Sequence, residues 1–544
     1  MKKFLFCFLS ILLIGFSAET LAIAAEIRLQ TNVDQSSRQV TISGITTAGA
    51  YRQVTVLVQA PDGAIDYIDQ TSSDENGFFE FTYFLNVGKT GTYKVRAGGT
   101  GIDNVAVTTF EYSAETPSSP HPGNIVTPVD EPDTVQATEK GARIVPGKSS
   151  ISETTDDEGN TVVTYTLDYE TFVRALDKLD SSGQEEQTIE IVIETEQKTN
   201  IILPGEIVKA AIDTGKEMIL AVRNHEGYYN LPIIMLQDAV TDQAFILVTI
   251  GPAYDALQTR IRSLLGNAAV LIKAMEYEVE VVQDGNKVLI SDFGNIFVER
   301  GFLLSQSVDD PDSATVVLYD PEKDELMFVP SLFQENDSLT VVVVKRTGNS
   351  AYAVVEHEKT FEDIQGHWAE HEIELLASKY IISGISDTMF APSEMLTRAQ
   401  FAALIVRALG LSDRQGEVSF RDVDQRAWYA GAVAAANEVG IVAGYPDETF
   451  RPSDPITREQ LMVMLARALE FAGKSPGVSE NDVLEQYRDS NQISAWAVSG
   501  VAASVNAGIV KGITPDTLGP DRNVTRAEAA VMIKRALKYL EFIN

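Results

Sequence analysis

Three arginines in the last third of the chain recur at a spacing that could serve the recognition of an anion. Each lies 14 residues after a glycine, and each glycine lies 16 residues after a tryptophan. The chain has no other tryptophan, and a pattern without insertions across three copies indicates an internal repeat. An arginine guanidinium is well suited to hold a carboxylate, so the repeat is a candidate anion site. The three sets are Trp368, Gly384 and Arg398; Trp428, Gly444 and Arg458; and Trp496, Gly512 and Arg526.

The residues around each arginine predict the start of a helix. The arginines stand in the motifs TRAQ, TREQ and TRAE, in which threonine caps the helix and glutamine or glutamate three residues later completes a capping box. The capping threonines are Thr397, Thr457 and Thr525. A cation in the first turn opposes the helix dipole, at a cost of about 0.3–1 kcal/mol. The arginine therefore needs a partner that its own helix does not supply.

Two kinds of partner fit the arginines. An arriving anion would meet both the guanidinium and the free backbone N–H groups of the helix N-terminus. Alternatively, each arginine forms an ion pair with the aspartate that opens a neighbouring unit, in the segments FEDI, FRDV and YRDS. These aspartates are Asp363, Asp422 and Asp489. The sequence leaves both partners open, and the two could alternate between the free and the bound protein.

Each unit is predicted to fold as helix, loop and helix. In the first helix, the tryptophan and the residues five and thirteen positions later are apolar, which favours one buried stripe. We therefore expect the three tryptophans in the core of the repeats. The first helix is expected to end at a glycine in the left-handed conformation, at Gly440 and Gly508. The first copy departs from this pattern, because Tyr380 occupies the position.

The second unit, FRDVDQRAWYAGAVAAANEVGIVAGYPDETFRPSDPITREQ at residues 420–460, resembles an S-layer homology domain. The aromatic-x-Asp opening, the tryptophan, Gly-Tyr-Pro-Asp and Thr-Arg-Glu-Gln stand in the order of that family. Three copies form its usual triplet, at residues 359–415, 416–479 and 480–544. The first and third copies read GISDTMFAP and GITPDTLGP in place of the full Gly-Tyr-Pro-Asp loop.

This resemblance implies an α-helical S-layer homology triplet in a pseudo-threefold arrangement. It implies grooves between the repeats that bind secondary cell wall polymers, often through a pyruvylated sugar. The polymer-binding residues would then be the arginines, the loop glycines and the opening aspartates, namely Arg398, Arg458, Arg526, Gly384, Gly444, Gly512, Asp363, Asp422 and Asp489. Because the loops differ between copies, the resemblance leaves open which grooves are competent.

The segment HWAEH, from His367 to His371, offers a second kind of chemistry. The pattern His-x-x-Glu-His supplies two histidines and a glutamate, as in one group of zinc peptidases. However, the same positions read AWYAG and AWAVS in the other copies, and no clear third ligand is evident. We therefore expect a structural helix here, with no metal site, no catalytic residue and no zinc-dependent activity.

Ahead of the repeats the sequence predicts four regions. Residues 1–24 have a basic start, an apolar run and a small-residue cleavage site, which is typical of a secretory signal peptide. Residues 25–113 alternate short β-rich runs with turns, which favours an immunoglobulin-like β-sandwich. Residues 114–147 are rich in Pro, Ser and Thr, which predicts a linker. Residues 148–358 mix helical and strand periods, which predicts an α+β module in two halves, the second mostly strands, of unknown role.

The composition limits the partners of the chain. A formal net charge of −35 disfavours binding to nucleic acid or to an anionic membrane. No stretch after the N-terminal segment is long and apolar enough to span a membrane, and the only cysteine, Cys7, lies inside that segment. We expect no cofactor, and the sequence leaves calcium uptake by the acidic surface open.

These features together predict a secreted, non-enzymatic surface protein that its C-terminal triplet holds at the cell wall or S-layer. The expected partner is an anionic wall glycan. One alternative is a subunit that self-associates into an S-layer lattice, which ordered arrays under calcium would favour. Another is an anchored enzyme with its activity in residues 148–358, which a cluster of perturbed carboxylates in one cleft would favour.

Overall fold

The computed structural model describes residues 26–544, apart from residues 34–37, 62–64, 86–88, 100–104, 114–132, 157–158, 180–185, 242, 267–268, 284–285, 309, 322, 337–338, 415–419 and 478–482. The expected signal peptide and most of the expected linker lie outside the described residues. The chain forms two compact units. The first holds the residues up to Ser118 together with residues 284–286, and the second holds the rest.

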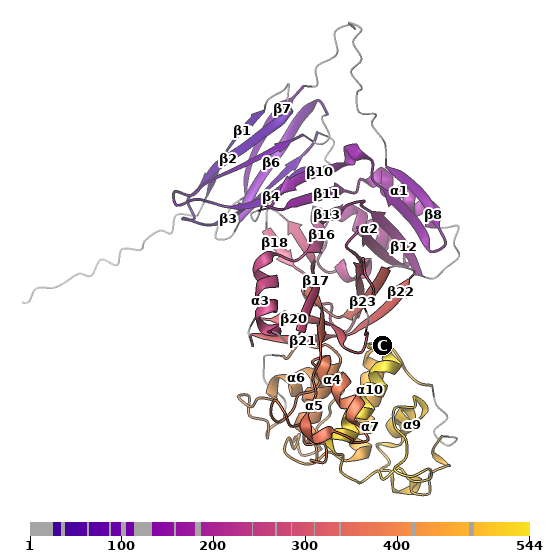
Figure 1. Ribbon diagram of the computed structural model, residues 1–544. Coiled ribbons are helices and arrows are strands. Elements are labelled where there is room, and N and C mark those ends of the chain that lie inside the picture. The colour runs from indigo at the N-terminus through magenta and orange to yellow at the C-terminus, as the bar shows by residue number, and fades with distance from the viewer. Residues whose placement is uncertain are drawn as a thin grey trace, which may run out of the picture. The chain divides into compact units, whose positions relative to one another are not determined.

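The first unit consists of strands in two antiparallel sheets (Figure 1). One sheet has the order β1-β2-β5 and the other has the order β4-β3-β6-β7. The strands are β1 (Ile27–Val33), β2 (Gln39–Thr46), β3 (Gln53–Gln59), β4 (Ile65–Ser72), β5 (Phe78–Phe84), β6 (Gly91–Gly99) and β7 (Ala106–Tyr112). Both sheets contribute to one core, in which the rings of Tyr67 and Tyr83 stack with their centroids 4.1 Å apart. The β-rich runs expected within residues 25–113 form β2, β3, β5, β6 and β7, and the structure adds β1 and β4 to them.

The second unit begins with a central module that is mostly β-sheet. Within the described residues, its first sheet runs β10-β11-β13-β16-β17-β24-β20-β21, with β18 beside β17. These strands are β10 (Ile151–Thr155), β11 (Thr161–Thr166), β13 (Lys198–Pro204), β16 (Phe245–Pro252), β17 (Ala269–Gln283), β18 (Asn286–Leu289), β20 (Ala314–Asp320), β21 (Glu325–Val329) and β24 (Ser350–His357).

The second sheet of the module runs β22-β23-β19-β15-β14-β12-β9-β8. Its strands are β8 (Thr134–Thr138), β9 (Gly141–Val145), β12 (Glu186–Val192), β14 (Glu217–Arg223), β15 (Gly227–Pro232), β19 (Val298–Leu304), β22 (Ser331–Asn336) and β23 (Leu339–Arg346). Three α-helices accompany the two sheets, namely α1 (Tyr169–Leu179), α2 (Gly205–Asp213) and α3 (Asp255–Leu265). The bounds of α1 are those of the amphipathic segment YETFVRALDKL, whose Phe172, Ala175 and Leu179 are buried at helical spacing.

Residues 133–147, which were expected in the linker, belong instead to this module. Strands β8 and β9 pair with each other, and β9 pairs in parallel with β12. The buried carboxylate of Asp133 accepts hydrogen bonds from the N–H of Gly147 at 2.8 Å and from the hydroxyl of Tyr165 at 2.7 Å. The linker prediction extended too far because composition alone does not show where strand pairing begins.

The central module does not divide into two halves along the chain. Strand β24 pairs with both β17 and β20, and a large core includes residues from Ala142 to Val354. A smaller core includes Leu257 and Ile261 of α3. Strands that are distant in the sequence are therefore neighbours in the sheets. The periodicity of a single strand shows which face is buried but does not show its partner, so this pairing could not be predicted.

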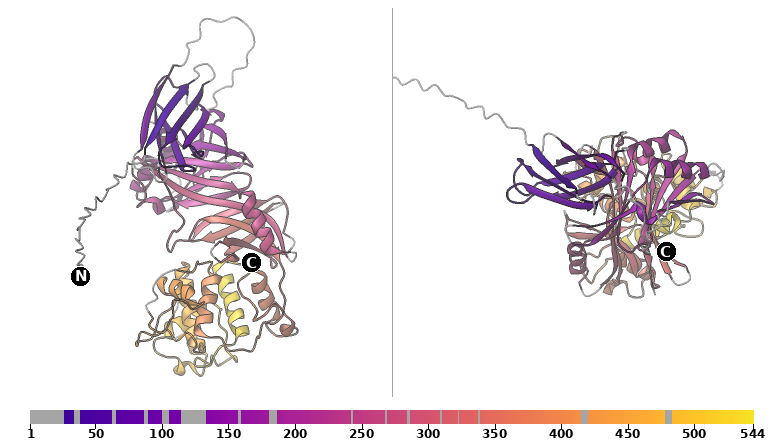
Figure 2. Two further views of the ribbon diagram at one scale, coloured as in Figure 1. Left: turned by 90° about the vertical axis from the view of Figure 1, so that its left-hand side faces the viewer. Right: turned by 90° about the horizontal axis from the view of Figure 1, so that it is seen from above.

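The last part of the second unit contains the three repeats. We call residues 359–415 repeat 1, residues 416–479 repeat 2 and residues 480–544 repeat 3. The helices of the repeats are α4 (Glu370–Ser378), α5 (Arg398–Ala408), α6 (Ala430–Glu438), α7 (Arg458–Phe471), α9 (Val498–Asn506) and α10 (Arg526–Leu540). Figure 2 shows them from a second side. No helix in the described part of the chain is long and apolar enough to cross a membrane.

The three repeats contact one another in a closed ring. The second helix of each repeat packs against the first helix of the next, as α5 does with α6, α7 with α9 and α10 with α4. Three backbone hydrogen bonds close the ring ahead of the second helices. The N–H of Leu396 donates to the carbonyl of Val524 at 2.9 Å, that of Val524 to Ile456 at 3.1 Å, and that of Ile456 to Leu396 at 2.9 Å. One hydrophobic core is common to all three repeats.

The three tryptophans lie outside this core, contrary to the sequence-based expectation. Trp368, Trp428 and Trp496 are 63%, 67% and 58% exposed. The first helices begin two residues after each tryptophan, so the tryptophan lies in the preceding turn and off the buried stripe. The next residue points inward instead, since Ala369 and Ala497 are fully buried.

The first helix of each repeat is followed by a residue in the left-handed conformation. Gly440 and Gly508 have φ values of 75° and 68°, which is the cap that the sequence predicts. Tyr380 adopts the same conformation, with a φ of 59°. Its ring stacks on the ring of His357 of β24, with the centroids 4.5 Å apart. The strain of a non-glycine residue is thus offset by a contact with the central module.

The central module and the repeats share a buried interface within the second unit. Phe328 of β21 belongs to the hydrophobic core of the repeats. The buried ammonium of Lys379 donates to the carbonyls of Pro311 and Ala314, at 2.8 and 2.6 Å. At the end of repeat 3, the N–H of Ser331 donates to the carbonyl of Phe542 at 2.8 Å.

Candidate functional site

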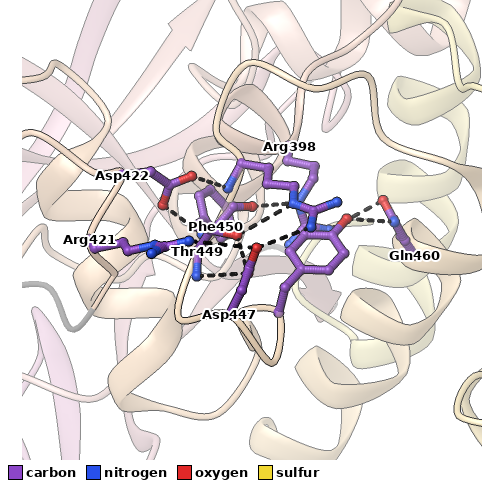
Figure 3. A network of polar contacts seen from close by, with 9 residues as sticks. Arg398, Arg421, Asp422, Asp447, Thr449, Phe450 and Gln460 are labelled. Carbon is purple, nitrogen blue, oxygen red and sulfur yellow. Dashed lines mark hydrogen bonds and ion pairs between the residues drawn. The ribbon is translucent and has the colours of Figure 1, made fainter.

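The first-turn arginines reach from each repeat into the next one. Nε of Arg398 in repeat 1 donates to the carbonyl of Phe450 in repeat 2, at 2.8 Å (Figure 3). In the same way, Nε of Arg458 donates to Leu518 at 2.8 Å, and Nε of Arg526 donates to Phe390 at 2.9 Å. The partners that the arginines need are therefore backbone carbonyls.

A second nitrogen of each guanidinium holds the start of the same loop. We call residues 384–391, 444–451 and 512–519 the glycine loops. Nη2 of Arg458 donates to the carbonyl of Lys511 at 3.1 Å, and Nη2 of Arg526 donates to that of Ser383 at 2.8 Å. The corresponding distance from Arg398 to Ala443 is 3.5 Å. Each arginine therefore holds both ends of the glycine loop of the next repeat.

The opening aspartates hold the same loops from within their own repeat. The carboxylate of Asp422 accepts hydrogen bonds from the N–H groups of Phe450 and Arg451, at 2.7 and 2.8 Å. Asp363 does the same for Phe390 and Ala391. Burial alone would raise the pKa of the Asp363 carboxyl, but these two N–H donors outweigh it and hold the pKa below its ordinary value.

Asp489 completes the set in repeat 3. Its carboxylate accepts hydrogen bonds from the N–H of Leu518 at 2.9 Å and from that of Gly519 at 2.7 Å. Among the described residues, none of the three opening aspartates forms an ion pair within 4.0 Å of a first-turn arginine. The arginine and the aspartate therefore do not pair with each other. Each binds the backbone of the same glycine loop separately.

The helix N-termini have no free N–H groups in their first turn. The first two N–H groups of α7 donate to the carbonyls of Arg522 and Pro520, both at 2.9 Å, and the third donates to the side chain of Thr457. The same arrangement recurs at α5 and α10, and all three capping threonines take part in a complete capping box. The expectation that an anion meets these groups is therefore wrong, because the next repeat already occupies them.

Burial of the first-turn arginines differs between the repeats. Arg398 is 6% exposed and Arg458 is 3% exposed, whereas Arg526 is only half-buried. Burial lowers the pKa of each of the three guanidinium groups below its ordinary value. In repeat 1, the guanidinium of Arg398 also lies over the rings of Tyr445 and Phe450, 4.9 Å from each centroid.

A glycine stands first in each glycine loop because a Cβ at that position would collide with neighbouring atoms. A Cβ added to Gly444 would lie 2.4 Å from the ring of Phe420, and one added to Gly384 would lie 2.5 Å from the ring of Phe361. A Cβ on Gly512 would lie 2.1 Å from the carbonyl oxygen of Thr514. The aromatic residue of each aromatic-x-Asp opening therefore packs on the glycine, while the aspartate binds the other end of the loop.

A second set of arginines was not predicted from the sequence. Nη1 of each arginine donates to a backbone carbonyl that follows the first helix of the same repeat. The pairs are Arg407 with Ile381 at 3.5 Å, Arg467 with Ile441 at 3.5 Å and Arg535 with Ile509 at 3.3 Å. Each of the three is half-buried. Each lies nine residues after a first-turn arginine, so the triplicate spacing could have revealed them.

Arg407 lines a pocket of about 730 Å³ between the central module, repeat 1 and repeat 2. Repeat 1 contributes Gly384 and Ser386 of its glycine loop, and repeat 2 contributes the exposed ring of Trp428. We call this the groove pocket. It brings a guanidinium, an indole and a glycine loop together, although the glycine loop is the only one of these that the sequence placed in a groove.

The two histidines of HWAEH lie apart from any such arrangement. His367 precedes α4, so the two rings do not share a helical face. Nδ1 of His367 is 3.2 Å from the N–H of Ala369, and Nε2 of His371 is 3.9 Å from the carboxylate of Asp312. Within the described residues, no three His, Cys, Asp or Glu side chains are grouped so as to hold a metal ion.

A model of the S-layer homology domain matches residues 360–402, 419–462 and 486–530. The C-terminal region is an S-layer homology triplet. The match covers each tryptophan, each glycine loop and each first-turn arginine, and it ends before the C-terminal half of each second helix. The triplet and its surface-layer relatives indicate a secreted protein at the cell wall or cell surface.

Three relatives show how far the similarity extends. An amylopullulanase of Thermoanaerobacterium thermosulfurigenes is 30% identical over 60% of this chain and 19% of its own length. An exoglucanase of Acetivibrio thermocellus is 37% identical over 33% of this chain and 16% of its own length. A surface-layer 125 kDa protein of Lysinibacillus sphaericus is 30% identical over 33% of this chain and 15% of its own length. The chain thus spans less than a fifth of the length of these relatives.

The amylopullulanase match is longer than the triplet. Its 355 residues exceed the stretch from residue 360 to residue 544, so it includes part of the chain ahead of the repeats. Among solved structures, a tetra-tandem repeat in the extending region of a large adhesion protein matches at 12% identity, over 60% of this chain and 65% of that chain. Its TM-score of 0.15 is too low for a comparison of folds.

The expectation of a non-enzymatic protein is wrong. Besides the amylopullulanase and the exoglucanase, the relatives include an endoglucanase and an endo-1,4-beta-xylanase. The prediction rested on the lack of a recognisable catalytic motif in residues 148–358. A catalytic pair of carboxylates needs no fixed sequence motif, so this lack was not evidence against activity.

Proposed function

We propose that the S-layer homology triplet anchors the chain by binding an acidic wall polymer in the groove pocket. The observation that carries this proposal is the convergence of Arg407, the glycine loop of repeat 1 and the exposed Trp428 on one pocket. A pocket of about 730 Å³ lies within the range of roughly 300–1,000 Å³ that small-molecule sites occupy. The match to the family of anchoring repeats supports the same conclusion.

The chemistry of the groove pocket suits a sugar that carries a carboxylate, such as a pyruvylated sugar. The guanidinium of Arg407 has one long hydrogen bond, of 3.5 Å to Ile381, and it can offer a planar fork to a carboxylate. The indole of Trp428 presents an uncovered apolar face on which a sugar ring can lie. Together the two side chains distinguish an acidic sugar from a neutral one.

The residues that the sequence assigned to the polymer act, in this proposal, by shaping the groove. Arg398, Arg458 and Arg526 hold the glycine loops through backbone carbonyls, and the aspartates hold the same loops through N–H groups. The glycines let the loop backbone approach an aromatic ring. These residues are therefore positioning residues, and Arg407, Arg467 and Arg535 are the proposed contact cations.

We also propose a pseudo-threefold arrangement of the repeats and an immunoglobulin-like fold for the first unit. The cyclic bonds of Leu396, Ile456 and Val524 support the first. The second is supported by a sheet of the first, second and fifth strands that packs on a sheet of the fourth, third, sixth and seventh. The proposed role of this unit is that of a spacer or a binding domain, and the proposed domain bounds are those given above, with the linker ending at residue 132.

The test of anchoring uses the full chain rather than the triplet alone. Phe328 and β22 of the central module cover part of the triplet, so a fragment that begins at residue 360 would expose apolar surface. We expect Arg407→Ala to weaken cosedimentation with purified wall sacculi, and extraction of the secondary polymer to abolish it. The matched control is Arg143→Ala, because Arg143 is an exposed arginine of the central module that pairs with Glu190 outside the groove pocket. Equal binding by the Arg407 and Arg143 variants would contradict the proposal.

A second candidate function is hydrolysis of a polysaccharide, and the names of four relatives favour it. Three carboxylates, Glu276, Glu278 and Glu280, follow one face of β17. Burial, and then the two neighbouring carboxylates, raise the pKa of Glu278, as a general acid of a glycosidase requires. The test is the release of reducing ends from amylopectin, cellulose and xylan. Release by the wild type that is lost in Glu278→Gln would support this candidate, and no release from any of the three would contradict it.

A further inference from the structure

The groove pocket has walls from two parts of the chain. Besides the repeats, the turn between β20 and β21 and the start of β21 line it, from Lys323 to Met327. This part of the central module therefore lines the same pocket as Arg407 and Trp428. A ligand in the groove pocket meets a surface that does not belong to the triplet.

A second pocket shares Trp428 with the groove pocket. It has a volume of about 930 Å³ and is lined by the central module, the end of repeat 1 and repeat 2, including Asn349, Arg414 and Gln425. We call it the module pocket. Five residues line both pockets, namely Lys323, Met327, Leu411, Asp413 and Trp428. The two pockets are thus adjacent at these residues.

An ion pair stands where the two pockets meet. Nζ of Lys323 in the central module lies 2.8 Å from the carboxylate of Asp413, which follows α5 of repeat 1, and 3.7 Å from that of Glu325 on its own module. The side chains of Lys323 and Asp413 are 39% and 31% exposed, so solvent screens the pair. An exposed pair of this kind contributes only about 0–1 kcal/mol, and a competing anion can therefore displace Asp413 at little cost.

We propose that the module pocket is a second saccharide subsite, and that Lys323 and Asp413 determine its preference for an acidic glycan longer than one residue. A sugar bound beside Arg407 leaves the continuing chain at Trp428, where the module pocket begins. The ammonium of Lys323 then exchanges Asp413 for an acidic group on the next sugar. The polar lining of the module pocket, with Ser291, Thr347, Ser350 and Gln425, suits sugar hydroxyls. This proposal rests on the proposed binding of wall polymer in the groove pocket.

Two substitutions separate a binding role of the ion pair from a structural role. Lys323→Ala removes the cation that a ligand would use, whereas Asp413→Asn removes the carboxylate that competes with the ligand. If the pair binds ligand, the two variants change affinity in opposite directions. If the pair only holds the module against repeat 1, both variants break the same contact and change affinity in the same direction.

The experiment is calorimetric titration of the full chain with secondary polymer released from walls and fractionated into single-repeat and longer fragments. For the longer fragments we expect Lys323→Ala to weaken binding about tenfold, as the loss of a hydrogen bond to a charged group predicts, and Asp413→Asn to tighten it. For the shortest fragments, which meet Lys323 and Asp413 only from the groove pocket, we expect a smaller change in each variant. Lys287→Ala is the matched control, because Lys287 pairs with Glu280 on the same module outside both pockets.

The other possible outcomes show which of the two proposals fails, the second subsite or the groove pocket. Unchanged affinity for the longer fragments, equal losses for both fragment classes, or shifts of the same sign in the two variants would overturn the second subsite. Unchanged affinity of Arg407→Ala for the shortest fragments would overturn the groove pocket itself. Melting curves of all variants identify any loss that comes from unfolding.

Discussion

Arg458 and Asp489 hold the peptide group that joins Leu518 to Gly519, without forming an ion pair within 4.0 Å of each other. Nε of Arg458 donates to the carbonyl of Leu518 at 2.8 Å, and the carboxylate of Asp489 accepts from the N–H of Gly519 at 2.7 Å. The arginine comes from repeat 2 and the aspartate from repeat 3. The conformation of this glycine loop therefore depends on contacts from two repeats.

Arg458→Ala should destabilise the triplet strongly. The substitution leaves the buried carbonyl of Leu518 and the carbonyl of Lys511 without their donor, at a cost of about 1–3 kcal/mol. The sequence left open whether the arginine has a structural partner or binds an anion. The measurement is urea unfolding followed by tryptophan fluorescence, because all three tryptophans lie in the repeats.

The control for this variant is Arg421→Ala. The side chain of Arg421 is 66% exposed and lies 3.9 Å from that of Asp447, so its removal should change stability by less than about 0.5 kcal/mol. If the Arg458 and Arg421 variants unfold at the same urea concentration, the buried carbonyls do not depend on the guanidinium.

Asp363 should give the triplet a stability component that disappears in acid. Its carboxyl has a lowered pKa in the folded protein because, against the opposing effect of burial, the N–H groups of Phe390 and Ala391 favour the anion. The unfolded chain therefore binds a proton at a higher pH than the folded one does. The component is fully present above about pH 4 and is lost as the pH falls through the folded pKa.

Unfolding free energies of the wild type and Asp363→Asn, measured from pH 6 to pH 2, test this component. The wild type should lose its advantage over the variant as the pH falls. A constant difference between the two proteins across this range would show that the charge of Asp363 does not contribute.

The turn at the end of each glycine loop predicts a stabilising substitution. Ala391 and Arg451 have left-handed φ values of 61° and 58°, and repeat 3 has Gly519 at this position, with a φ of 66°. Ala391→Gly should stabilise the protein by about 0.5–1 kcal/mol, because the strain it removes exceeds the entropy that glycine adds to the unfolded chain. The reciprocal Gly519→Ala should destabilise it, since the new Cβ would lie 2.2 Å from the side chain of Ile513. Thermal unfolding measures both, and effects of the same sign would contradict the assignment.

Trp428→Ala should destabilise the protein less than a substitution in the core does. The indole is 67% exposed, so its loss should change the free energy of unfolding by no more than about 0.5–1 kcal/mol. Val433→Ala in the fully buried stripe of α6 should cost about 1–3 kcal/mol. The Trp428 variant should nevertheless bind wall polymer more weakly, which cosedimentation measures. A larger loss of stability in Trp428→Ala than in Val433→Ala would show that the tryptophan packs in the core.

Local structure in this chain could be predicted from the sequence, whereas contacts between distant segments could not. The capping threonines followed from motifs of four residues, because their hydrogen bonds lie within one turn of helix. The exposure of Trp428 was missed because α6 starts two residues later than the apolar pattern predicts. The occupied helix N-termini were missed because their partners, such as Pro520 for α7, belong to another repeat.

The sequence predicted which residues meet at the borders between repeats, and their role in polymer binding stays a prediction. Spacing alone located the glycine loops, the arginines and the aspartates, and these residues do meet at the borders between repeats. Which atoms they offer to a ligand depends on burial, and Arg458 is buried whereas Arg407 reaches a pocket. The contribution of Lys323 could not be predicted, because nothing in residues 148–358 indicates that this turn docks on repeat 1.

The bonds between β22 and the residues after α10 also govern how the anchor carries a mechanical load. Besides the bond from Ser331 to Phe542, the N–H of Phe333 donates to the side chain of Asn544 at 2.9 Å, and that side chain donates back to the carbonyl of Phe333 at 2.8 Å. A pull on the central module thus enters the triplet both through the covalent chain at repeat 1 and through this clasp at repeat 3. Tension applied to the central module would therefore reach the first and the last repeat together.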